Sequence, residues 1–151
     1  MTTAQLSAVT VALTTPHDPA AFYQTRAGLC VSRHYRDRIV QKATPTQSAS
    51  PVTLKRLVLE RDASDKYIEA KLGANHEFTE SEICWIVAEM IGKQKDGEAG
   101  DLDNTGHVNL FYTTSGFVLL FWLGDDRGWL VDSWGPGGDA WNGGGSVFSR
   151  N

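Results

Sequence analysis

The chain has 151 residues, of which 41% are hydrophobic, 21% charged and 10% aromatic, and these values are typical of one ordinary soluble domain. A chain of this length buries roughly two-thirds of its unfolded surface, so it needs no disulfide or metal staple. The composition excludes the collagen-like, coiled-coil and disordered classes. No uncharged apolar run reaches the roughly 18 residues of a membrane-spanning helix, so no membrane partner is expected.

Charge is unevenly distributed along the chain. The net charge of −4 divides into +5 for residues 1–61, −3 for residues 62–95 and −6 for the remainder. Such a separation of positive and negative charge can orient a partner as it approaches. The same separation is found in proteins whose charged faces contact only solvent. The acidic total argues against a strongly basic nucleic-acid binder.

Cys30 and Cys84 are the only cysteines, too few for the disulfide framework of a secreted domain. The N-terminal residues lack the basic start and the apolar stretch of a secretory signal. We therefore expect a cytoplasmic protein, and a phage or viral accessory protein would have the same composition.

Strands and helices alternate in the first half of the chain. The predicted elements are a strand over 8–14, a helix over 33–43 with Ser32 as its N-cap, a strand over 52–60, and a short helix that Asp62 or Ser64 caps and that ends before Gly73.

The helix over 80–95 has the clearest signal. Thr79 and Glu82 form a T-x-x-E capping box, and Phe78 stands where a hydrophobic staple packs. Apolar residues then repeat at helical spacing and form one stripe, which consists of Ile83, Ile86, Val87, Met90 and Ile91. We expect this amphipathic helix to be the main core element.

The sequence changes character after residue 91, where 13 of the 15 glycines and four of the five tryptophans lie. Strands expected over 107–113, 117–123 and 128–133 are joined by short turns and form an antiparallel meander. Residues 135–145 are irregular, and residues 147–148 add a short edge strand. The chain is therefore predicted to be a single α+β domain, with two to three helices packed on one face of an antiparallel sheet.

Residues 129–136 (WLVDSWGP) resemble the strand of papain-like cysteine peptidases that ends in Asn-Ser-Trp-Gly, with Asp132 in place of that Asn. His107 opens a strand as Gly-His-Val, as the catalytic histidine of that family does. Gln24 lies six residues before Cys30, which is the family's spacing from the oxyanion glutamine to the nucleophile. The resemblance implies a cysteine hydrolase with Cys30 as nucleophile, His107 as base, Asp132 as the orienting residue and Gln24 in the oxyanion hole.

The predicted strand order argues against this catalytic set. The strand over 117–123 separates His107 from Asp132, and two strand spacings amount to about 10 Å, too far for a hydrogen bond. A free cysteine in an apolar run is commonly a small buried hydrophobe. We therefore expect Cys30 to be buried and out of hydrogen-bond reach of His107.

Motifs for metals and cofactors are incomplete. Asp101, Asp103 and Gly106 match the start of a calcium loop, but Tyr112 stands where the loop needs a bidentate Glu, so an Asx turn is expected. The histidines and cysteines lack zinc-binding spacing, and no glycine-rich phosphate loop joins a strand to a helix. Neither a metal nor a cofactor is therefore predicted.

A basic cluster in the first half offers a way to bind nucleic acid, with Tyr23 or Tyr35 stacking on a base. The cluster consists of Arg26, Arg33, Arg36, Arg38 and Lys42. The acidic remainder of the chain argues against nucleic acid as a partner.

The tryptophans of the glycine-rich segment indicate a binding surface. Trp134 and Trp141 supply contact area there, and Asp132 and Asp139 beside them supply negative charge. The same indoles could form a sugar-stacking platform, or fold back to close the edge of the sheet. The favoured prediction is a small non-enzymatic protein-binding or regulatory module whose partner has a basic surface. A papain-like cysteine hydrolase and a carbohydrate- or nucleic-acid-binding module are the alternatives.

Overall fold

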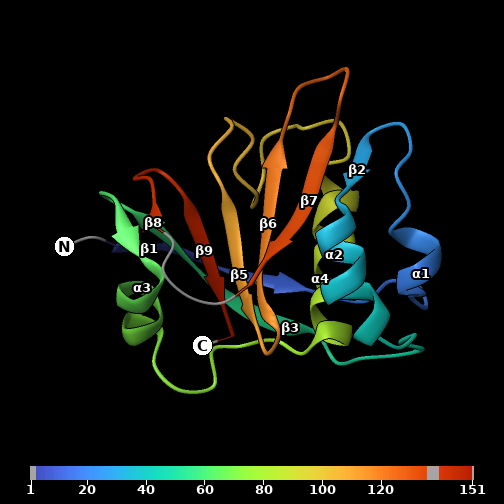
Figure 1. The fold of residues 1–151 in the computed structure, drawn as a ribbon, viewed down its shortest axis with the longest axis horizontal. Coiled ribbons are helices and arrows are strands. Elements are labelled where there is room, and N and C mark those ends of the chain that lie inside the picture. Colours follow the sequence, from blue (N-terminus) through green and yellow to red (C-terminus); the bar gives the residue numbers. More distant parts are fainter. Residues whose placement is uncertain (1–2, 136–139, 151) are drawn as a thin grey trace.

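A central sheet of seven strands organises the part of the chain that the structure, a computed structural model, describes, which is residues 3–135 and 140–150 (Figure 1). The strands follow the order β1-β3-β9-β5-β6-β7-β2. Their bounds are β1 Thr3–Val11, β2 Leu29–Val31, β3 Val52–Leu59, β5 Asn109–Thr113, β6 Gly116–Trp122, β7 Trp129–Trp134 and β9 Ser146–Ser149. A separate two-stranded ribbon pairs β4 (Ala63–Ser64) with β8 (Ala140–Trp141).

Most neighbouring strands are antiparallel, and the predicted meander is present as β5, β6 and β7. Two pairs are parallel, β5 with β9 and β2 with β7. The expectation that residues 147–148 form an edge strand is wrong, because β9 lies between β3 and β5 and all of its residues are buried. A strand buried on both faces is typical of the interior of a sheet.

Four α-helices lie within the described residues: α1 Pro19–Phe22, α2 Arg33–Arg38, α3 Asp65–Leu72 and α4 Glu80–Lys93. The capping residues act as predicted, since Ser32 accepts from the backbone N–H of Tyr35 and Ser64 from that of Tyr67. The helix predicted over 33–43 is shorter than expected. It ends at Arg38, and a 3₁₀ turn over Val40–Lys42 continues the chain.

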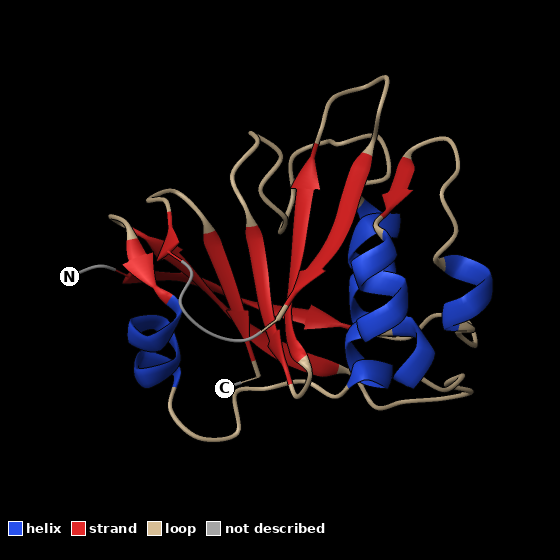
Figure 2. Ribbon diagram, in the orientation of Figure 1, coloured by secondary structure: helices blue, strands red, loops and turns tan. Residues whose placement is uncertain are grey.

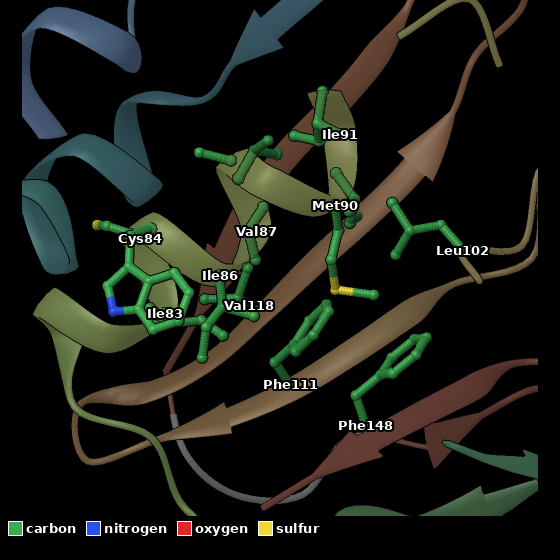
Figure 3. Packing of buried hydrophobic residues seen from close by; sticks show 14 of the residues in the cluster. Ile83, Cys84, Ile86, Val87, Met90, Ile91, Leu102, Phe111, Val118 and Phe148 are labelled. Carbon is green, nitrogen blue, oxygen red and sulfur yellow. The ribbon is translucent and has the colours of Figure 1, made fainter. Parts of the chain in front are cut away.

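Helix α4 builds the core on one face of the sheet, together with α1 and α2 (Figure 2). Its predicted apolar stripe is buried, and Ile83, Ile86 and Val87 have no exposed surface. Figure 3 shows this stripe facing the strands, where Phe111 and Phe148 stack with ring centroids 4.9 Å apart.

Helix α3 and the β4–β8 ribbon cover the opposite face, so the expectation that the helices share one face is wrong (Figure 1). Ile68 of α3 and Trp141 of β8 pack with Leu110 and Leu119 of the sheet. The physical reason is that β5 and the middle of β6 are buried on both sides, and such strands need cover on both faces. Helix α3 and the ribbon leave the part of this face that is formed by β2 and its neighbouring strands incompletely covered.

The uncovered part of this face is formed by three adjacent strands. Cys30 on β2, Leu130 on β7 and Phe121 on β6 are neighbours in the register, and all three are half-buried. Residues of one register row point to the same face of a sheet. This row lies near the amino end of β7, and Asp132 and Trp134 further along the strand point to the same face.

Candidate functional site

The structure does not bring Cys30 and His107 together. Cys30 lies on β2 and His107 lies just before β5, three strands away in the sheet. Three strand spacings amount to about 14 Å, so the thiol and the imidazole share no hydrogen bond. Cys30 is half-buried, which corrects the expectation that it is fully buried.

Gln24 and Asp132 have partners other than a catalytic pair. The exposed amide of Gln24 donates to the carbonyl of Ala20 at 3.2 Å. Asp132 accepts from the hydroxyl of Ser32 at 2.6 Å and from Nε1 of Trp134 at 3.1 Å. The carboxylate of Asp132 thus holds the start of α2 and the indole of Trp134, and it orients no imidazole.

The basic cluster is largely engaged within the molecule. Arg33 pairs with Asp37 on the surface of α2, and Arg36 and Arg38 donate to backbone carbonyls at 3.2 Å and 3.0 Å. The rings of Tyr23 and Tyr35 are fully buried. These two tyrosines therefore cannot stack on the bases of a nucleic acid.

The calcium-like segment forms the expected Asx turn. Oδ1 of Asp103 accepts from both the backbone N–H and the hydroxyl of Thr105 at 2.8 Å. The same hydroxyl lies 3.0 Å from Nδ1 of His107. The turn therefore fixes the imidazole of His107 beside the start of β5.

A hollow of about 280 Å³ lies beside this histidine, on the incompletely covered face of the sheet. Trp134 and Trp141 stack in its wall, with ring centroids 5.4 Å apart and planes inclined by 27°. Trp134 is 43% exposed, whereas Trp141 is 6% exposed. We call this hollow the indole pocket, and its lining residues are Gly106, His107, Val108, Phe121, Trp134, Ala140, Trp141 and Asn142.

Each indole N–H of the pocket donates to a carboxylate. Nε1 of Trp134 bonds Asp132, and Nε1 of Trp141 donates to Oδ1 of Asp65 at 2.6 Å. Asp65 is the first residue of α3 and is buried, and its Oδ1 also accepts the hydroxyl of Tyr112 at 2.9 Å. Burial and the adjacent Asp65 raise the pKa of Tyr112 well above its ordinary value, so this hydroxyl remains a donor. Oδ2 of Asp65 has no hydrogen-bond partner.

Three of the four residues predicted to form the binding surface come together here, namely Asp132, Trp134 and Trp141. Asp139 lies outside the described residues. Sequence reasoning missed Phe121 and Asp65 as parts of this site. Alternation along the strand 117–123 would have placed Phe121 on the face of Phe117 and Leu119, but Asp65 lies 76 residues from Trp141 and carried no local signal.

A larger hollow of about 430 Å³ lies between α1 and α4. Its charged residues are already engaged, since Glu89 accepts from the backbone and hydroxyl of Thr14, and the guanidinium of Arg26 lies 4.7 Å above the ring of Phe22. The indole pocket is therefore the stronger candidate for a binding site.

No protein-family model, curated protein or solved structure matches this chain. Within the described residues, no helix combines the length and the apolar character that crossing a membrane requires.

Proposed function

We propose that the protein is a non-enzymatic binding module that takes a basic side chain of a protein partner into the indole pocket. The observation that carries this proposal is the stack of Trp134 on Trp141, in which each indole donates its N–H to a carboxylate.

The electrostatics of the two indoles favour a cationic ligand. The face of an indole ring carries negative charge density and attracts ammonium and guanidinium groups. An N–H that donates to a carboxylate polarises its ring further, since bonded groups in a chain strengthen one another. Asp132 and Asp65 also add negative charge beside the two rings. An arginine or lysine side chain therefore suits the pocket better than an acidic or a neutral one.

The size and exposure of the pocket fit a single side chain. Its volume of about 280 Å³ lies below the range of roughly 300–1,000 Å³ that is usual for small-molecule and cofactor sites. Trp134 leaves 43% of its surface open to a partner, while the buried Trp141 supports it from below. A partly exposed tryptophan on a rigid base is typical of the residues that dominate binding energy in protein interfaces.

Peptides that differ only in their central residue test this proposal. Arginine, lysine, glutamine and glutamate versions are titrated into the protein, with tryptophan fluorescence and calorimetry as readouts. We expect binding of the arginine and lysine versions, and a loss of at least about tenfold in affinity for Trp134→Ala, since interface tryptophans commonly contribute more than 1.4 kcal/mol.

Tyr67→Ala is the matched control, because Tyr67 is the other large hydrophobic residue that the described part of the chain exposes and it lies on α3 outside the pocket lining. Asp132→Asn removes one charge and keeps the shape, and we expect it to weaken the basic peptides selectively. Equal affinity for the four peptides, or binding of an oligosaccharide through Trp134 with no effect of peptide charge, would overturn the proposal.

A further inference from the structure

The loop that follows α3 turns the chain back onto its own helix. Gly73 and Asn75 both have positive φ, 76° and 62°, and such a pair of left-handed residues reverses a chain within a few positions. Phe78 then anchors the loop by donating its backbone N–H to the carbonyl of Tyr112 at 2.9 Å. The reversal places His76 against Glu69, which lies one turn before the end of α3.

The hydrogen bonds of His76 fix its tautomer. Nδ1 lies 2.6 Å from the carbonyl oxygen of Gly73, which can only accept, so Nδ1 carries the proton. In the neutral ring, Nε2 then carries an unprotonated lone pair, and this nitrogen lies 3.1 Å from Oε1 of Glu69. Two acceptors at this distance repel each other, and a metal ion held between them removes the repulsion.

A backbone carbonyl on Nδ1 is also the arrangement that commonly orients a metal-ligating histidine for coordination through Nε2. The ring of His76 is held on its other side by Tyr112, with ring centroids 5.8 Å apart and planes inclined by 76°. Its side chain is 11% exposed, so the imidazole is positioned before any ligand arrives.

We propose that Glu69, His76 and Glu77 bind a divalent transition-metal ion of the Zn²⁺ class. One ligand atom of each residue lies within 4.8 Å of the other two, and within the described residues this is the one such group of three. Metal bonds of about 2.1 Å in tetrahedral geometry require ligand atoms roughly 3.4 Å apart, so small side-chain rotations complete the site. Glu77 is exposed, which leaves room for water as a fourth ligand.

No zinc-binding pattern is visible in the sequence, because the spacings of seven and one residues between Glu69, His76 and Glu77 match no common motif. Only the reversal at Gly73 and Asn75 brings the three side chains together. The proposed metal site is separate from the indole pocket, so failure of either proposal leaves the other intact.

Calorimetry of the full chain with Zn²⁺ tests the site, and the visible absorption of bound Co²⁺ reports its coordination. We expect one ion per chain, with affinity at least about tenfold weaker in His76→Ala and Glu69→Gln, since even residues behind the ligands commonly contribute 10–100-fold. The exposed His34 provides the matched control, and His34→Ala should bind as the unmodified chain does.

Thermal melts show whether each variant is folded. If His76→Ala unfolds, Glu77→Gln tests the site in its place, because Glu77 is exposed and its substitution should leave the fold intact. Absence of saturable Zn²⁺ binding by the full chain would overturn the proposal. Binding that persists unchanged in folded His76→Ala or Glu77→Gln would also overturn it.

Discussion

Trp134 and Trp141 contact each other, yet their surroundings give them different roles. Trp141 is buried, donates to Asp65 and packs edge-on against Phe117 at 5.5 Å. Trp134 rests on this base with 43% of its surface exposed. The alternative in which the tail folds back and buries both indoles at the sheet edge is therefore wrong, because Trp141 alone is buried and Trp134 stays exposed.

This difference predicts unequal costs of truncation. Trp141→Ala should lower the free energy of unfolding by about 3–5 kcal/mol, since it removes a buried indole and leaves Asp65 with one donor fewer. Trp134→Ala should cost no more than about 1.5 kcal/mol, the usual value of a stacked aromatic pair. Chemical denaturation of both variants measures the two costs, and equal values would contradict this assignment.

His17 is a buried histidine whose Nε2 has no hydrogen-bond partner. Burial lowers its pKa below the ordinary value of 6.5, against the smaller opposing effect of Asp18 and Glu89. Below pH 6.5 the unfolded chain therefore binds a proton that the folded chain does not, and stability falls as the pH falls through this window.

We expect His17→Phe to reduce this acid sensitivity, because a phenyl ring packs beside Phe22 and Tyr23 without a titrating group. One proton contributes at most about 1.4 kcal/mol per pH unit. The measurement is the change in unfolding free energy between pH 7.5 and pH 5.5 in both proteins. An equal change in the two would show that His17 is not involved.

At the scale of elements, α4 carries the core of one face. Ile83 and Ile86 are fully buried in its stripe, and their replacement by alanine should each cost about 2–5 kcal/mol in unfolding free energy. Lys93→Ala, at an exposed position of the same helix, is the control for a change in helix propensity. Losses below about 1 kcal/mol for both isoleucines would place the stripe outside the core.

Elements with local signals could be predicted from the sequence. The capping box at Thr79 and Glu82 fixes the start of α4, and short turns join β5, β6 and β7 into neighbouring strands. The end of α2 could not be predicted, because the apolar pattern of Tyr35, Ile39 and Val40 continues through the 3₁₀ turn. Periodicity marks which residues are buried and does not fix where α-helical hydrogen bonding ends.

At the scale of the whole molecule, the sheet interleaves distant parts of the chain. β9 from the C-terminal end lies between β3 and β5, and β2 pairs with β7 about 100 residues later. Such pairings join segments that lie far apart in the chain, and nothing in a single sequence shows which of these segments will contact each other. The face that α3 covers and the position of β9 were therefore beyond prediction.

The candidate site could likewise be predicted only where its residues lie close together in the sequence. Asp132 and Trp134 lie close together on one strand, and the concentration of tryptophan, glycine and aspartate in this segment is what predicts them as binding residues. Asp65 and Phe121 reach the site from other elements through the fold. All the residues that line the pocket lie in the C-terminal part of the chain, which carries a net charge of −6.

Binding of a basic side chain in the indole pocket can be followed by nuclear magnetic resonance of the five indole N–H groups of the chain. An arginine-centred peptide is titrated into ¹⁵N-labelled protein. We expect the signals of Trp134 and Trp141 to shift together and saturate, and those of Trp85, Trp122 and Trp129 to remain in place. Saturable shifts confined to the other three indoles, or to the arginine-rich surface of α2, would contradict this expectation.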